Sequence, residues 1–121
     1  MRHERSRIRI KNLRLRTYIG FNPEEQEKRQ DVVVNVTIDY DALPAARADE
    51  VERALDYKGI TKRIIALVED NRFLLLEKLV SDILDIAMAA EQVERAEVEV
   101  DKPHALRFSD SVSLAMAASR E

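Results

Sequence analysis

The segment from Asp31 to Tyr40 constrains the fold more than any other, because apolar side chains recur there at every second position. One phase of the alternation holds Val32, Val34, Val36, Ile38 and Tyr40, and the other holds Val33, Asn35, Thr37 and Asp39. A period of two places successive side chains on opposite faces of an extended chain. We therefore predict a β-strand that packs one face on the core.

The N-terminal segment shows the same alternation with a change of phase. One phase holds Ile8 and Ile10, whereas the other holds Leu13 and Leu15. All four side chains can face one core only if a β-bulge absorbs one residue, which we place at Lys11 or Asn12. The first strand is therefore expected to be long and bent.

Two connecting segments lack a regular period. After the turn residues Gly20, Asn22 and Pro23, the polar run 24–30 predicts a loop of the kind that often carries functional residues. Residues 41–55, which include Pro44 and several alanines and acids, predict an irregular connector.

Helical spacing governs the middle of the chain. We expect a first helix, capped by Asp56, with the apolar residues Tyr57, Ile60, Ile64, Leu67 and Val68. We expect a second helix, capped by Asn71, with the apolar stripe Leu76, Leu79, Val80, Ile83, Ile86, Ala87 and Ala90. Leu84 and Met88 lie opposite the centre of that stripe, which predicts a contact with another subunit.

The chain then returns to alternation. Inward positions are predicted for Ala96, Val98 and Val100, with Arg95, Glu97, Glu99 and Asp101 outward, and a last strand holds Val112, Leu114, Met116 and Ala118. The order is therefore strand, strand, helix, helix, strand, strand (ββααββ). We predict a single α+β domain over residues 1–121, with a four-stranded antiparallel sheet and two helices on one face.

Composition limits the class of protein. A chain of 121 residues with 45% hydrophobic content suffices for one compact domain. Cysteine is absent, which excludes disulfides and favours a reduced cytoplasm. No apolar run approaches the roughly 18 to 20 residues of a membrane span, and residues 1–11 lack the continuous apolar stretch of a signal peptide. We expect an unprocessed cytoplasmic protein with no membrane partner.

The charge pattern does not indicate a nucleic-acid-binding protein. The 20 basic and 23 acidic residues are interspersed and leave a net charge of −3. The exception is a basic N-terminal cluster of Arg2, Arg5, Arg7, Arg9, Lys11, Arg14 and Arg16. It is either a solvated strand face or frayed terminus, or an anion site.

Lys102 interrupts an apolar face. Counting by two from Ala96 through Val100 places this lysine on the inward side of its strand. One reading ends the strand at Asp101, because Pro103 restricts the residue before it and Lys102 can then extend into water. The other reading is a partly desolvated functional amine.

Four segments together resemble the dihydroneopterin aldolase and epimerase family. They are the loop 23–30, Leu55-Asp56-Tyr57, Leu75-Leu76-Glu77 and Asp101-Lys102-Pro103, in the family's order and approximate spacing. The segments 8–17, 71–73 and 104–107 look closer to the branch that epimerises dihydroneopterin triphosphate. Many aldolases carry a histidine just before the glycine that matches Gly20, whereas this chain has Tyr18-Ile19-Gly20, so the role of that histidine does not transfer.

The resemblance implies the tunnelling fold (T-fold) and a homo-oligomer. In this fold the small sheets of several subunits join into a barrel, and two tetramer rings stack, commonly as an octamer, with active sites between neighbours. The resemblance also implies a pterin substrate and no cofactor. His3 and His104 are the only histidines and lie far apart in the sequence, so we predict no metal site.

The resemblance assigns roles to residues that have ordinary structural explanations as well. Glu77 would bind the 2-amino group and N3 of the pterin, and Leu76 would add a backbone group, although a carboxylate in a first helical turn is also favoured by the helix dipole. Tyr57 would relay protons with its hydroxyl group, although its position is also typical of a core aromatic.

The remaining assignments concern the substrate's side chain. Glu25 would orient the hydroxylated tail, although it is by default a solvated loop acid, and Glu24 is the alternative if the loop register differs. Lys102 would carry the proton; burial would favour its neutral amine, and a nearby Glu25 would favour the ammonium form. Candidates for binding a triphosphate are Arg14, Arg16, His104 and Arg107.

The expected reaction is epimerisation of 7,8-dihydroneopterin triphosphate at C2′ by retro-aldol and aldol steps. The alternative is aldol cleavage of dihydroneopterin to glycolaldehyde and 6-hydroxymethyl-7,8-dihydropterin. A second alternative is a catalytically silent pterin-binding or assembly module, because fold does not imply function.

Overall fold

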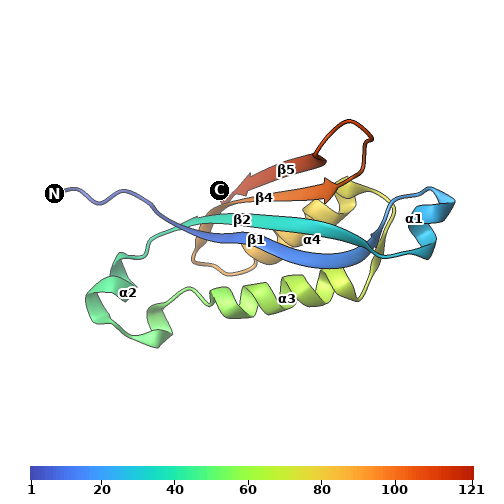
Figure 1. The fold of residues 1–121 in the computed structure, drawn as a ribbon. Coiled ribbons are helices and arrows are strands. Elements are labelled where there is room, and N and C mark those ends of the chain that lie inside the picture. Colours follow the sequence, from blue (N-terminus) through green and yellow to red (C-terminus); the bar gives the residue numbers. More distant parts are fainter.

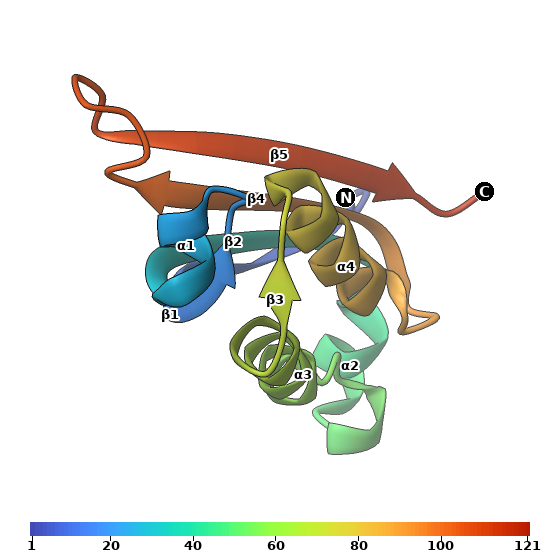
Figure 2. The same ribbon diagram turned by 90° about the vertical axis from the view of Figure 1, so that its right-hand side faces the viewer.

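A curled sheet with the strand order β3-β1-β2-β4-β5 organises the computed structural model, which describes all 121 residues (Figures 1 and 2). The long strands are β1 (Ser6–Ile19), β2 (Gln30–Tyr40), β4 (Val93–Pro103) and β5 (Ser111–Ser119), and each pairs with its neighbour antiparallel. These four strands confirm the predicted antiparallel sheet. The fifth strand, β3 (Arg72–Phe73), was not expected; it pairs in parallel with the end of β1.

The predicted bulge lies in β1. Ile10 pairs with Val36, but the next core pair is Leu13 with Val34, so β1 holds one extra residue. Asn12 has a φ of 52°, and its backbone N–H donates to Asn35 Oδ1 at 2.8 Å. Asparagine tolerates this left-handed conformation better than most residues. The bulge keeps the apolar residues on both sides of it on one face.

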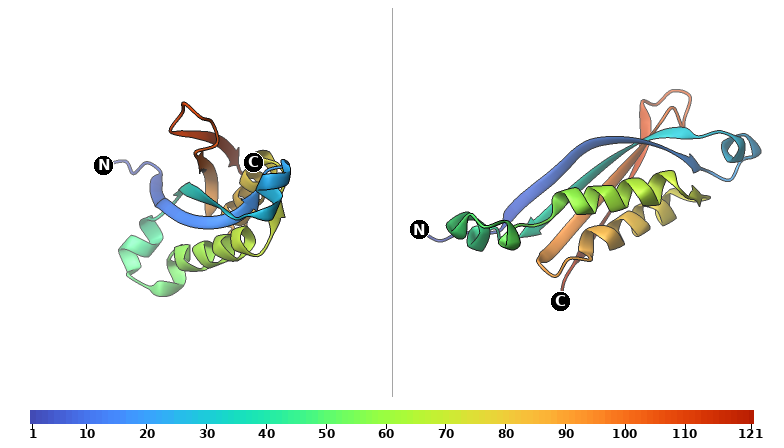
Figure 3. Two further views of the ribbon diagram at one scale, coloured as in Figure 1. Left: turned by 45° about the vertical axis from the view of Figure 1, so that its right-hand side comes forward. Right: turned by 90° about the horizontal axis from the view of Figure 1, so that it is seen from below.

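Helices α3 (Tyr57–Glu69) and α4 (Leu76–Met88) cover one face of the sheet, as predicted (Figure 3). Ile64, Val68, Leu79 and Ile83 are fully buried there. Burying a side chain of this size contributes about 1.5 to 3 kcal/mol. The Asp56 cap is confirmed, because Asp56 Oδ1 accepts a hydrogen bond from Gly59 N at 2.9 Å.

The prediction that Asn71 caps the second helix is wrong. Helix α4 begins at Leu76, with Leu75 as the N-cap residue. The intervening residues are extended because Arg72 and Phe73 pair with β1. Asn71 instead ends the preceding helix, where its Nδ2 donates to Leu67 O at 2.9 Å.

The prediction that Leu84 faces another subunit is also wrong, whereas that for Met88 stays a prediction. Leu84 is only 7% exposed and belongs to the core, and Met88 is half-buried against it. The physical reason is that α4 packs on both β4 and β5. Because two strands lie against α4, they cover more of the helix surface than the single apolar stripe.

Short helices occupy both connectors. Helix α1 (Pro23–Glu27) replaces the predicted loop, and the irregular connector contains α2 (Leu43–Ala48) and the 3₁₀ helix η1 (Val51–Arg53). Helices α1 and α2 lie at opposite ends of the molecule (Figure 1). None of the helices combines the length and the apolar character needed to cross a membrane.

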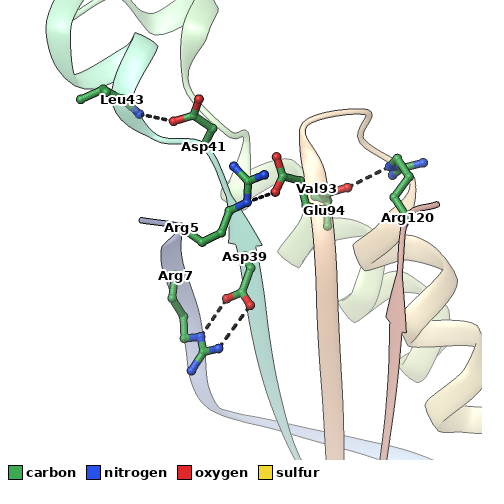
Figure 4. A network of polar contacts seen from close by, with 8 residues as sticks. All are labelled: Arg5, Arg7, Asp39, Asp41, Leu43, Val93, Glu94 and Arg120. Carbon is green, nitrogen blue, oxygen red and sulfur yellow. Dashed lines mark hydrogen bonds and ion pairs between the residues drawn. The ribbon is translucent and has the colours of Figure 1, made fainter. Parts of the chain in front are cut away.

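Ion pairs cover part of the basic N-terminal cluster (Figure 4). The Arg7 guanidinium donates to the Asp39 carboxylate at 2.8 and 3.2 Å, which lowers the pKa of Asp39, and Arg5 pairs with Glu94. Arg120 Nε donates to Val93 O at 2.9 Å and ties the C-terminus to the same end of the sheet. For Arg7 the reading as a solvated strand face is therefore correct, whereas Arg5 precedes β1.

Candidate active site

Lys102 and Glu25 form an ion pair at the end of the sheet where α1 lies. Strand β4 continues through Pro103, and Lys102 pairs with Val112 of β5. The two side chains are only 15% and 21% exposed. The reading that ended the strand at Asp101 is therefore wrong, and so is the default reading of Glu25 as a fully solvated loop acid.

Several groups fix the Glu25 carboxylate. Lys102 donates to Oε2, Gln30 Nε2 donates to the same oxygen at 3.3 Å, and Asn22 N donates to Oε1 at 3.4 Å. The hydrogen bond from Lys102 is the main reason that the pKa of Glu25 lies below its usual 4.5, against the opposing effect of burial. Glu25 is therefore an acceptor-only carboxylate at neutral pH.

Gly20 makes room for this carboxylate. Its φ of 126° is a conformation that side chains rarely allow, and a Cβ atom at this position would overlap the Glu25 carboxyl group. The Gly20 N–H also donates to Phe73 O at 2.9 Å and links β1 to β3. The sequence marked Gly20 only as a turn residue.

Arg72 links β3 to helix α1. Its Nη1 donates to Gln26 O at 3.0 Å, and its guanidinium carbon lies 3.8 Å from the centroid of the Tyr18 ring. Gln30 adds a hydrogen bond from Nε2 to Ile19 O at 2.6 Å. Sequence reasoning assigned no site role to Arg72 or Gln30, because their spacing does not show that they contact the backbone oxygens of Gln26 and Ile19 and, for Gln30, the Glu25 carboxylate.

Glu77 and Leu76 lie at the same end of the molecule as the ion pair. Both belong to the first turn of α4, which directly follows β3, and β3 is bonded to Gly20 beside α1. Glu77 is exposed and makes no ion pair or side-chain hydrogen bond within the chain. Leu75 supplies no side-chain cap, so the first N–H groups of α4 are available to a ligand.

Tyr57 lies at the opposite end. It opens α3, whose other end leads into β3 beside α1, and a helix of 13 residues is about 20 Å long. The side chain is 48% exposed, so the reading as a core aromatic is wrong; the first buried residue of α3 is Ile60. One chain alone does not bring Tyr57 to Lys102.

The four basic residues predicted to bind a triphosphate lie in two different places. Arg14, Arg16 and His104 line one cavity of about 350 Å³. Arg107 does not line it; its guanidinium carbon lies 5.6 Å from the centroid of the exposed Phe108 ring. No group of three or more His, Asp or Glu side chains is arranged to hold a metal ion.

The sequence profile of dihydroneopterin aldolase matches residues 8–117, which is most of the chain. The chain belongs to the dihydroneopterin aldolase family. It is 54% identical over 115 residues to a dihydroneopterin triphosphate 2′-epimerase of Pseudomonas aeruginosa, which covers 95% of this chain and 94% of that protein. A protein of the same name from Escherichia coli strain K12 is 56% identical over 113 residues, with 93% of this chain and 94% of that protein covered.

A solved structure supports the fold of this family member. E. coli dihydroneopterin aldolase in complex with neopterin superimposes with a TM-score of 0.89 at 24% identity, covering 94% of this chain and 99% of that one. The expected tunnelling fold is therefore confirmed for the single subunit.

Proposed function

We propose that this family member converts 7,8-dihydroneopterin triphosphate to 7,8-dihydromonapterin triphosphate by inverting C2′. The half-buried Lys102–Glu25 ion pair carries this proposal, because it supplies a proton carrier and a fixed carboxylate at one point. More than half of the aligned residues are shared with proteins named dihydroneopterin triphosphate 2′-epimerase.

The substrate itself supplies the electron sink. A base removes the proton of the C2′ hydroxyl, the C1′–C2′ bond breaks, and its electron pair passes into the C=N bond of the dihydropterin ring. The C2′–C3′ fragment becomes an aldehyde that stays bound and rotates to present its other face. The electron pair then returns to the other face of the aldehyde, C1′–C2′ forms again, and the alkoxide regains its proton.

Lys102 fits the proton transfer, and Glu25 fits the positioning of the substrate. In our proposal Lys102 exchanges protons with the substrate at the end of β4, and Glu25 orients the hydroxylated tail as a hydrogen-bond acceptor. Gly20 and Gln30 keep the carboxylate in place. Positioning of this kind matters, because a small displacement of a reacting group lowers the rate strongly.

Glu77 and Leu76 fit the ring edge. A free carboxylate at the start of α4 can accept two parallel hydrogen bonds from the 2-amino group and N3, which adds geometric specificity. The uncapped N–H groups of the same turn can donate to the ring carbonyl, and Leu76 supplies one of them.

Tyr57 fits only as a contribution from another copy of the chain. Tyr57 and Val51 are exposed at one end of the subunit, and Leu74 and Leu75 are exposed beside Glu77 at the other. The outer edge of β5, and that of β1 before its pairing with β3 at Tyr18, are also open for pairing. We infer a closed ring in which each site lies between two subunits, with an octamer of two tetramer rings as the expected size. A stable, active monomer in light scattering would contradict the shared site.

A product assay tests the reaction directly. With dihydroneopterin triphosphate and no added metal or nicotinamide, we expect the dihydromonapterin epimer, identified by chiral chromatography after phosphate removal. The family also supports aldol cleavage, which shares the retro-aldol step. Dominant release of glycolaldehyde from dihydroneopterin would therefore assign the aldolase activity, and no product from a folded oligomer would favour the silent module.

The substitution Glu77→Gln tests the proposed binding of the pterin ring by Glu77. The substitution keeps the shape but replaces one acceptor oxygen with a donor, so pterin binding should weaken by about 1.5 to 3 kcal/mol. Fluorescence titration measures this, with Asp85→Asn as a control on an exposed acid of the same helix. An unchanged pterin affinity would leave Glu77 only its favourable interaction with the helix dipole.

A further inference from the structure

Helix α1, which carries Glu25, lies at one end of the molecule and has no apolar anchor (Figure 1). None of its five residues is buried. A helix this short does not persist by itself, because isolated helices of fewer than about 12 residues are marginal in water. The position of α1 must therefore come from polar contacts with the rest of the chain.

Two side chains from distant parts of the sequence donate hydrogen bonds to α1. Lys102 donates to the Glu25 carboxylate, and Arg72 Nη1 donates to Gln26 O at 3.0 Å. The first bond ends on the carboxylate that we propose orients the substrate, whereas the second ends on the helix backbone. Arg72 therefore holds the helix without occupying an oxygen of Glu25.

The bond from Lys102 changes during the proposed reaction. Lys102 gives up and regains a proton, and its bond to Glu25 has the strength of an ion pair only while the amine is protonated. A guanidinium, by contrast, keeps its charge at every pH at which enzymes work. The bond from Arg72 to α1 therefore persists through the whole cycle.

Arg72 is exposed, but its conformation is fixed. Its backbone pairs with Tyr18 between β1 and β3, its guanidinium carbon lies 3.8 Å from the centroid of the Tyr18 ring, and the next residue, Phe73, is buried. A planar guanidinium can stack on a ring and donate a hydrogen bond from its edge at once, which an ammonium group cannot do. Phe73 O also accepts the Gly20 N–H at 2.9 Å, so β3 is bonded to the chain on both sides of Glu25.

We propose that Arg72 is a positioning residue for Glu25: its hydrogen bond to Gln26 O keeps α1, and with it the carboxylate, in place while Lys102 exchanges its proton. The inference rests on the proposed function and adds to it a residue that makes no ion pair with the carboxylate itself. Because β3 leads into α4, the same segment would also set the position of the carboxylate relative to the ring-binding turn at Glu77.

A double-mutant cycle on kcat tests this role. Arg72→Gln should lower kcat for dihydroneopterin triphosphate about 10- to 100-fold with KM little changed, since a displacement of about 1 Å can cost that much in rate. In the Glu25→Gln background the same substitution should lower kcat less than about twofold, because a residue that acts through Glu25 then has nothing to position. Effects that multiply in the double variant would overturn the inference, as would a normal kcat in Arg72→Gln.

Two further variants serve as controls. Arg72→Lys keeps a donor but loses the planar group that stacks on Tyr18, so it should recover part of the lost rate. Arg63→Gln removes an exposed arginine in the middle of α3 and should leave kcat and KM unchanged. Arg72→Gln should unfold at nearly the same temperature as Arg63→Gln, because substitutions of exposed residues change stability little.

Hydrogen exchange in α1 separates this inference from the reaction. The amide of Gln26, which donates to Asn22 O at 3.1 Å, should exchange about 10-fold faster in Arg72→Gln than in Arg63→Gln. If the wild type epimerises neither pterin, the proposed function fails, but this difference would still support the role of Arg72 in holding α1. Equal exchange in the two variants would overturn the inference even if the epimerase is active.

Discussion

Lys102→Ala should lower the epimerisation rate by about 10²- to 10⁴-fold, the usual contribution of a positioned proton-transfer group. The alanine removes the only amine that contacts Glu25. Pterin binding should be spared, because the ring edge is assigned to Glu77 on a different element. Steady-state kinetics with chiral product analysis gives the rate, and fluorescence titration gives the pterin affinity.

Loss of activity must be separated from loss of fold, because Lys102→Ala leaves a half-buried carboxylate without its partner. The double variant Lys102→Ala/Glu25→Gln removes that charge as well and should remain inactive while unfolding at a more normal temperature. Lys11→Ala is the matched control, because Lys11 is an exposed strand lysine with no partner in the chain. A Lys102→Ala enzyme with a nearly normal kcat would exclude Lys102 as the proton carrier.

Periodicity was sufficient for the elements with a regular pattern. The alternation in β2 and the change of phase in β1 predicted two strands and a bulge that the register confirms. The two helices on one face were predicted for the same reason. Asn71 and Leu84 were interpreted wrongly because both depend on what lies beside them: a two-residue strand in one case and the width of the sheet in the other.

The candidate site was only partly accessible to sequence reasoning. The resemblance identified Glu25 and Lys102, which are 77 positions apart, and the structure places them in contact. Periodicity alone left Lys102 undecided, because a proline follows it. The supporting residues Gly20 and Gln30 act through distances that no spacing reveals. The proposed role of Tyr57 in the site could not be derived from one chain, because it needs a second copy.

Mixed oligomers should recover activity that neither parent variant has. In our proposal each site takes Lys102 from one subunit and Tyr57 from its neighbour, which the helix between them keeps apart within one chain. Lys102→Ala and Tyr57→Phe should each be nearly inactive alone, because each removes a proton-transfer group. When both are coexpressed in equal amounts and assemble randomly, about one quarter of the sites should contain both native residues.

A second mixture fixes the origin of that recovery. Wild-type chains coexpressed with the double variant Tyr57→Phe/Lys102→Ala should retain about one quarter of full activity if each site is shared, and about one half if each chain holds its own site. Two different affinity tags allow the mixed oligomers to be purified and their subunit ratio to be measured. No recovery in the first mixture together with one half in the second would place Tyr57 and Lys102 in one site of a single chain. Such a result would contradict the separation of about 20 Å that the length of α3 implies between Tyr57 and the end of the subunit that holds Lys102.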